Sequence, residues 1–552
     1  MSQRNTIDGA HDVTQAWFSP PADRRSLLDR AHRGDIVGAL GRVRSADTGP
    51  RRRYRRRVAA FLAIMGPGVI VLAADNDAGG IATYAQAGQD YGLRFLWLLV
   101  VMAGVLLVNQ EMVGRLGAVT GAGHARLIHE RFGRRWGAFA LGDLLILNFL
   151  VIVTEFIGVA LSLGYFGVTR YISVPLAALA LIAFPLAGRF RRWERAMYLL
   201  VAASFIAVPL LMLVHHSVHP IPAVAALGHR VPGSTVLMVV ALAGTTVAPW
   251  QLFFQQSNVV DKRITARWLP YERADTVAGT LLFALGAVAI LVTCALAFSA
   301  TPLHGAFTDA STVASELRDR AGPWAGALFA MALLNGSLLG AAAVTLSSSY
   351  AIGDVTGTKH SLHRTWRDAP KFHGSYAALV VLAATIVLIP KAPLGIVTTG
   401  VQALAGVLLP SALVFLLLLC NDRAVLGPWV NSRWLNAIAA SVVAVLLVLS
   451  GLLTISTLFP HAQTGGPHTA ILVTAAGILG MLFGLRLPRH DTTATPDGDV
   501  PGKPIWTMPP IETLPAPLRS PARTIALVTL RAYLLLAATA IMIKIARLIA
   551  AS

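Results

Sequence analysis

The sequence has little charge and almost no cysteine for its length. Only 13% of the 552 residues are charged, whereas 55% are hydrophobic. The two cysteines, Cys294 and Cys420, lie within apolar stretches, which argues against a disulfide framework and against a thiolate metal cluster. No H-E-x-x-H, G-x-S-x-G or nucleotide-binding loop occurs in a suitable context. We therefore predict that the chain is not an enzyme and holds no cofactor.

Long apolar runs take up most of the sequence. Many of them extend for close to 20 residues without a formal charge, which is about the length that crosses the hydrocarbon core of a bilayer. Twelve such runs lie near residues 58–88, 93–114, 137–166, 172–188, 196–216, 234–260, 276–300, 322–352, 373–390, 395–420, 434–458 and 469–487. The sequence thus predicts an all-α, multi-pass membrane protein whose partner is the lipid bilayer.

The charge that is present is mostly basic, with a formal net charge of +19. The basic residues form short clusters in alternate loops between apolar runs, while the intervening loops contain almost no Lys or Arg. This pattern follows the positive-inside rule and predicts a cytoplasmic N-terminus in the cell (inner) membrane. Because the basic residues do not gather in one patch, nucleic acid is not an expected partner.

Composition divides the chain into four parts. Residues 1–57 form a polar tail that ends in RRRYRRR and has no apolar segment typical of a signal peptide. The tail is either held near anionic lipid or simply solvated. Residues 58–487 form the membrane domain, and residues 488–522 read as a flexible linker. Residues 523–552 are apolar and basic, and they form an interfacial helix or an extra span.

The first apolar run is interrupted by acids and glycines. The stretch VLAADNDAGGIAT contains Asp75, Asp77, Gly79 and Gly80. A charge at the centre of a membrane costs at least about 2.5 kcal/mol, so it faces a protein interior, a partner or water. The glycines predict an unwound stretch, and free carbonyls beside carboxylates suit a hard cation. A buried, hydrogen-bonded aspartate at a helix kink is the alternative.

A second interruption lies in the sixth run, LAGTTVAPWQLFFQQS. Pro249 removes an intrahelical hydrogen bond there, with Thr245 and Gln251 nearby. Five spans separate the two breaks, at Gly79 and Pro249. This spacing predicts a five-plus-five inverted repeat of the leucine-transporter type, with discontinuous helices 1 and 6.

Four local motifs, in order, resemble the natural resistance-associated macrophage protein (Nramp) family of divalent metal transporters. Gly66 and Pro67 precede Asp77–Gly80 at the family's offset, where the family has Asp-Pro-Gly-Asn. Residues 245–251 resemble the family's Ala-Thr-Val-Met-Pro-His-Asn. Gln402 stands eight residues before Pro410, and NDRAVLGPWVNSRWLN follows as the family's loop does. The resemblance covers about residues 58–460.

Several positions depart from the family pattern. Gly80 replaces its asparagine, and Ala248 replaces its methionine, a thioether that favours softer transition metals. Trp250 and Gln255 replace its proton-linked histidines, and in VIVTEFIG, Ile152 stands where the family has an aspartate. With these departures the sequence resembles the Nramp-related magnesium transporters, which implies an oxygen-only site and transport without proton coupling.

The resemblance implies a monomeric transport unit that moves Mg²⁺, Mn²⁺ or both by alternating access. Asp77 would be the essential ligand, Thr245 would contribute a carbonyl, and Gln402 would close the occluded site. Asp75 would replace lost ligands or line the entrance. Glu155 is either a proton acceptor or a buried polar group. The remaining lining residues would be Gly80, Ala248, Trp250 and Gln251. The alternatives are a proton-coupled Mn²⁺ or Fe²⁺ transporter and an amino-acid or amine transporter of the same fold.

Overall fold

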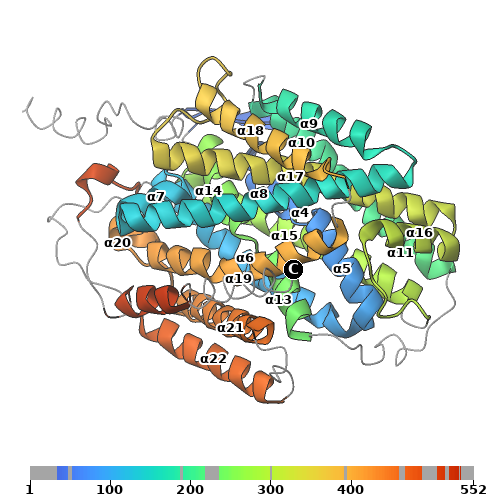
Figure 1. The fold of residues 1–552 in the computed structure, drawn as a ribbon. Helices are drawn as coiled ribbons and strands as arrows, with labels where there is room; N and C mark the ends of the chain where they lie inside the picture. Colours follow the sequence, from blue (N-terminus) through green and yellow to red (C-terminus); the bar gives the residue numbers. More distant parts are fainter. Residues whose placement is uncertain are drawn as a thin grey trace, which may run out of the picture.

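The structure is a computed structural model of a helical bundle (Figure 1). It describes residues 34–47, 53–186, 190–217, 235–298, 301–390, 394–458, 467–487, 506–515, 521, 523–533 and 535. Within these residues, 10 helices are long and apolar enough to cross a membrane, or up to 11 if the bent pair Tyr54–Ile64 and Pro67–Ala74 is one span.

The difference from twelve predicted spans has two sources. Residues Ala78–Thr120 form one continuous helical stretch that contains the whole second predicted span and part of the first, and Arg170–Leu186 falls among the shorter apolar helices.

The first predicted span consists of three helices: α3 (Tyr54–Ile64), α4 (Pro67–Ala74) and α5 (Ala78–Tyr91). A 3-10 turn, η1 (Gly92–Phe95), connects α5 to the next helix. The other helices are α6 (Leu96–Thr120), α7 (His124–Phe132), α8 (Arg134–Tyr165), α9 (Arg170–Leu186), α10 (Phe190–Ala203), α11 (Ala207–Ser217), α13 (Thr235–Thr246), α14 (Pro249–Asp261), α15 (Leu269–Phe298), α16 (Ala310–Ala321), α17 (Pro323–Thr356), α18 (Pro370–Val387), α19 (Leu394–Cys420), α20 (Arg423–Leu426), α21 (Arg433–Leu458) and α22 (Pro467–Arg486).

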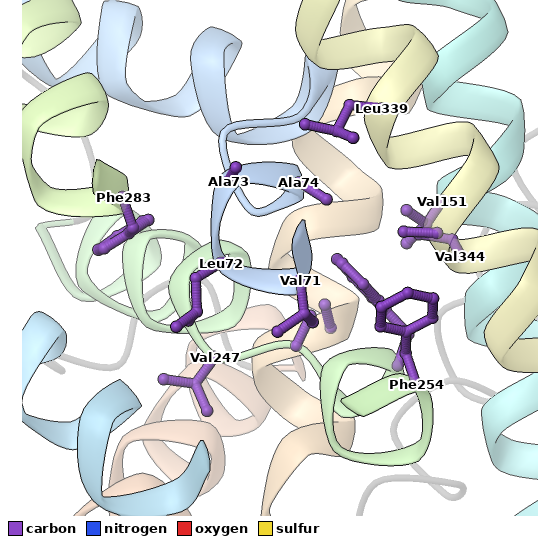
Figure 2. Packing of buried hydrophobic residues seen from close by; sticks show 14 of the residues in the cluster. Val71, Leu72, Ala73, Ala74, Val151, Val247, Phe254, Phe283, Leu339 and Val344 are labelled. Carbon is purple, nitrogen blue, oxygen red and sulfur yellow. The ribbon is translucent and has the colours of Figure 1, made fainter. Parts of the chain in front are cut away.

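The interrupted helices lie inside the bundle. In Figure 1, α21 and α22 lie along one edge and α9 and α18 along the opposite edge, while α4 and α5 lie between them. Every residue of α4 is buried. Figure 2 shows the last residues of α4, Val71 to Ala74, among apolar side chains that include Val247, Phe254 and Val344. This apolar packing holds a short helix that would be unstable alone.

The start of α4 is bonded to α15. The carboxylate of Asp275 accepts hydrogen bonds from the backbone N–H groups of Gly66 (3.0 Å), Gly68 (2.7 Å) and Val69 (3.2 Å). The first N–H groups of a helix have no partner within it, so a carboxylate can satisfy them. A Cβ on Gly68 would lie 2.8 Å from the backbone of Thr276, which means that the two helices touch along their main chains.

Part of the predicted N-terminal tail is folded against the helices. Strands β1 (Ile36–Gly38) and β2 (Gly41–Val43) form an antiparallel hairpin. At its turn, the N–H of Ala39 donates to Glu194, a buried residue that also pairs with Lys262. Residues 34–47 are therefore not a merely solvated tail.

The described C-terminal residues also contact the bundle. The N–H of Met508, within the predicted linker, donates to the carbonyl of Val119 at 3.3 Å. Residues 523–533 are helical, with Leu530 fully buried and the Arg523 guanidinium 4.8 Å from the centre of the Phe132 ring. Most of the remaining segment to residue 552 lies outside the described residues, so its predicted position as an interfacial helix or an extra span stays a prediction.

We expect Asp275→Ala to lower the stability of the protein, because three buried N–H groups of α4 would lose their charged acceptor. The loss should be roughly 2–4 kcal/mol, measured as a lower thermal unfolding midpoint in detergent. Asp309→Ala is the matched control, since Asp309 caps α16 with a bond to the N–H of Thr312. Such a cap is worth about 1 kcal/mol. Equal midpoints for the two variants would contradict the role of Asp275.

Candidate metal-binding site

Asp77 lies in the gap between α4 and α5. It is the N-cap residue of α5, its carboxylate accepts a hydrogen bond from the N–H of Gly80 at 2.6 Å, and it is only 3% exposed. The helix dipole stabilises a negative charge at this position. Asp77 is therefore held in place by the helix that it begins.

Asp75 lies at the end of α4 and is fully buried. One carboxylate oxygen accepts a hydrogen bond from the side-chain amide of Gln251 on α14, and the other, Oδ2, has no hydrogen-bond partner among the described residues. Gln251 also accepts a bond from Gln110 of α6 at 3.2 Å. The structure thus brings the predicted residues Asp75 and Gln251 into direct contact.

The second break lies between Thr246 and Pro249, the residues that end α13 and begin α14. Pro249 follows Thr245 by four positions and has no N–H, so the carbonyl of Thr245 lacks its usual helical donor. The buried hydroxyls of Thr245 and Thr246 also find no partner within the described part of the chain. Ala248 is buried at the N-cap of α14 and contributes only a methyl group.

The prediction that Gly79 marks the first break is wrong. The chain leaves the helix at residues 75–77, and Gly79 and Gly80 lie in the first turn of α5. Their role is steric: a Cβ on Gly79 would lie 1.7 Å from Nε2 of Gln402, and a Cβ on Gly80 would lie 2.7 Å from the carbonyl oxygen of Asp75. The glycines let other groups approach α5 closely.

Gln402 reaches the first turn of α5 from α19. Its Nε2 lies against Gly79 and, within the described residues, makes no hydrogen bond. Glycines also bring α13 and α19 together, because a Cβ on Gly244 would lie 2.2 Å from the backbone nitrogen of Gly406. This close packing places Gln402 beside the two breaks.

Glu155 lies next to Asp77. One oxygen, Oε2, accepts a hydrogen bond from the N–H of Ala78 at 3.1 Å, and the other has no partner in the part of the chain that the structure describes. A Cβ on Gly340 would touch both acids, at 2.7 Å from Cβ of Asp77 and 2.9 Å from the Glu155 carboxyl carbon. Gly340 therefore leaves room for the two acids to lie next to each other.

Trp250 is buried and packs against Phe254, with ring centroids 6.3 Å apart. Its carbonyl accepts a bond from Ser347 of α17 at 2.8 Å, which holds α14 against the bundle. Sequence reasoning missed Tyr84, a fully buried residue whose ring lies against Gly80 and whose hydroxyl has no hydrogen-bond partner among the described residues. Its position seven residues after Asp77, two helical turns along α5, was the available signal.

The donor atoms at the breaks are oxygens. They are the carboxylates of Asp75 and Asp77, the freed carbonyl of Thr245, and nearby hydroxyls and amides. No group of three or more His, Cys, Asp or Glu arranged to hold a metal occurs among the described residues. A site made of these oxygen donors suits a hard cation that is bound weakly enough to be released.

The chain is similar to proteins that are named as metal transporters. Divalent metal cation transporter MntH of Deinococcus radiodurans is 27% identical over 422 residues, which cover 72% of this chain and 91% of that protein. Divalent metal cation transporter MntH 1 of Pseudomonas aeruginosa is 29% identical over 412 residues, with 70% and 89% covered.

Solved structures share the fold. The crystal structure of the Eremococcus coleocola manganese transporter in complex with an aromatic bis-isothiourea substituted compound matches with a TM-score of 0.60 at 18% identity. The match covers 80% of this chain and 96% of that one. It confirms the predicted fold class, an all-α membrane protein with the leucine-transporter-type repeat and discontinuous helices 1 and 6.

The family model described as natural resistance-associated macrophage protein-like matches residues 68–456, well over half of the chain. The matched range contains both helix breaks and all the acids described above. The motifs that predicted the resemblance lie within it or directly at its start. The chain therefore belongs to the Nramp family.

Proposed function

We propose that the chain transports divalent metal cations across the membrane by alternating access, with the site formed by Asp75, Asp77, Thr245 and Gln402. The main support is that two interrupted helices place two buried acids near the second break, where Gln251 donates both to Asp75 and to the carbonyl of Thr246. The names of its relatives as divalent metal cation transporters agree with this proposal. Membership of this family also confirms the prediction that the chain is not an enzyme.

The site is proposed to take hard cations, Mg²⁺ as well as Mn²⁺. Ala248 offers no thioether, and Gly80 offers no side-chain donor, so oxygens make up the ligand set. Softer transition metals gain most from sulfur ligands, whereas Mg²⁺ keeps part of its water shell and needs few protein ligands. The assignment to the magnesium-transporting branch of the family stays a prediction.

An amino-acid substrate is less compatible with this site. In that alternative, the N-terminal N–H groups of a broken helix would bind the substrate carboxylate. Here two of those groups on α5 are already occupied, because Gly80 donates to Asp77 and Ala78 donates to Glu155. The two acids would also repel a carboxylate.

Uptake is proposed to be driven by the membrane potential without proton coupling. Trp250, Gln255 and Ile152 do not exchange protons near neutral pH. A divalent ion that crosses the full membrane gains about 4.6 kcal/mol per 100 mV. This energy is sufficient to concentrate the ion without a second substrate.

Proton-coupled Mn²⁺ transport is the second candidate. The observation that favours it is that Glu155 lies next to Asp77 and binds the N–H of Ala78, the residue after it. In this candidate, one carboxyl group would pass a proton to the other when a cation binds. The manganese transporter that shares the fold agrees with this candidate.

The proposed cycle moves α4 relative to the bundle. Helices α3 and α4 meet at a 49° bend, at Gly66, which has a φ of +150° that only glycine adopts readily. The other end of α4 is the break at residues 75–77. One chain contains the complete site, so the transport unit is proposed to be a monomer within residues 58–487, with the N-terminus on the cytoplasmic side.

We expect Asp77→Ala to abolish uptake of both Mg²⁺ and Mn²⁺ into proteoliposomes that contain ion-sensitive dyes, because the site would lose its central carboxylate. Asp319→Asn, at an exposed carboxylate, is the control and should transport normally. Wild-type protein that moves neither ion would rule out the proposed function.

Internal pH recorded in the same vesicles separates the two candidates. Mg²⁺ entry without acidification supports the uncoupled transporter. Mn²⁺ entry that requires a proton gradient, with no Mg²⁺ flux, supports the coupled one, and Glu155→Gln should then abolish the accompanying acidification.

We expect Gly79→Ala and Gln402→Ala to reduce uptake to a similar degree, and the double variant to be no worse than either. The reason is that the new Cβ displaces the same amide that the second substitution removes. Gly104→Ala is the control, since a Cβ there meets no atom within 4 Å. Additive losses in the double variant would show that Gln402 and Gly79 act separately.

A further inference from the structure

Glu272 is a fully buried acid that the proposed transport site does not use. It lies in the first turn of α15. Its hydrogen-bond donors are neutral: the amide of Gln255 at 2.8 Å and the hydroxyl of Thr276 at 3.4 Å. Both donate to the same oxygen, Oε1.

The carboxyl group of Glu272 lies against the backbone of α6. A Cβ on Gly114 would lie 2.1 Å from Oε1 and 2.5 Å from the second oxygen, Oε2, so only glycine leaves room for the carboxyl group. Among the described residues, Oε2 has no hydrogen-bond partner, and neither has Oε1 of Gln255. The carboxyl group and its amide neighbour therefore each carry an oxygen with unused bonding capacity.

The charged neighbours of Glu272 do not neutralise it. The groups that act on it are Glu111 of α6 and Asp275 of its own helix, both acidic. Glu111 is paired with Arg115 and Arg273, and Lys262 beyond α14 is paired with Glu194. Helix α4 has no titratable side chain, and α14 contributes the neutral Gln255.

An unpaired carboxylate in such surroundings is very costly, so a buried acid of this kind is held neutral by a proton. A buried ionisable residue inside a membrane transporter is also a candidate functional group. The missing partner of Glu272 is thus best supplied by a proton on Oε2.

The position of Glu272 links it to the movement of α4. Asp275, three residues later on the same helix, binds the first N–H groups of α4. Gln255 lies one helical turn after Gln251, which holds Asp75. Glu272 itself is covered by Gly114 of α6 and Gln255 of α14, so a movement of α4 that carries α14 or α15 with it would admit water to Glu272.

We propose that Glu272 is a proton-binding site that controls opening toward the cytoplasm. In the closed state Oε2 carries the proton. When the cytoplasmic side of the protein opens, the O–H bond of Glu272 breaks, the proton passes to water and the carboxylate is solvated. On closing, the acid takes a proton back from the same side, so no net proton crosses the membrane. The role in opening rests on the proposed function.

The test compares wild type with Glu272→Gln, a neutral isostere of the protonated acid that can keep the same contacts. Glu130→Gln, at an exposed glutamate of α7, is the control. Initial Mn²⁺ or Mg²⁺ uptake is measured in proteoliposomes with internal pH varied across neutrality and with external pH and membrane potential held constant. The infrared carbonyl stretch of protonated carboxyl groups is recorded on the same protein.

We expect wild-type and Glu130→Gln uptake to rise with internal pH. At every internal pH, Glu272→Gln should transport at the rate that wild type shows at low internal pH. The reason is that glutamine mimics the protonated acid, which favours the closed state. The infrared difference between wild type and Glu272→Gln should show one protonated carboxyl group.

Two results would overturn the proposal: an unchanged pH dependence in Glu272→Gln, or no carboxyl band lost in that variant. The infrared measurement does not need transport. Wild-type protein that transports no metal but shows the carboxyl band would rule out the proposed function and the control of opening. The conclusion that Glu272 is protonated would still hold in that case.

Discussion

The structure depends on one constraint: backbone polar groups inside a membrane protein need partners from the protein itself. Breaking a helix removes several of those partners at once. This chain breaks its first span at residues 65–66 and 75–77 and its sixth at residues 247–248. The polar side chains buried nearby are those that satisfy, or compete for, the freed groups.

Carboxylates meet this need on the N–H side of the breaks. Asp275 binds the first N–H groups of α4, Asp77 caps α5, and Glu155 accepts the N–H of Ala78. On the carbonyl side of a break, the backbone carbonyl oxygens lose their N–H donors. These oxygens can then accept a hydrogen bond from a hydroxyl or bind a cation. The hydroxyl of Ser450 donates to the carbonyl of Gly406, four residues before Pro410, whereas the carbonyl of Thr245, four residues before Pro249, lies at the second helix break. The same defect is thus structural in α19 and available for function in α13.

Glycine has a second role that the constraint explains. Broken helices are short, and they remain stable only if neighbouring backbones pack tightly against them. Gly68 lets α4 touch α15, Gly79 admits Gln402, and Gly244 brings α13 against α19. A glycine in this chain therefore more often marks a close approach than an unwound residue, which is why the predicted break at Gly79 was wrong.

The sequence by itself determined the class of fold, the family and the identity of the main acids, because hydropathy, loop charge and the motifs around Asp77 and Pro249 are local patterns. Only the tertiary structure decided where the first break lies and that Asp75 pairs with Gln251. It also showed that residues 34–47 fold onto the bundle, and that Glu272 is buried with no cationic partner among the residues that the structure describes. These features depend on contacts between residues far apart in the chain, such as Gly114 with Glu272 and Gly66 with Asp275. No local pattern carries that information, because burial and partner choice are properties of the packed helices.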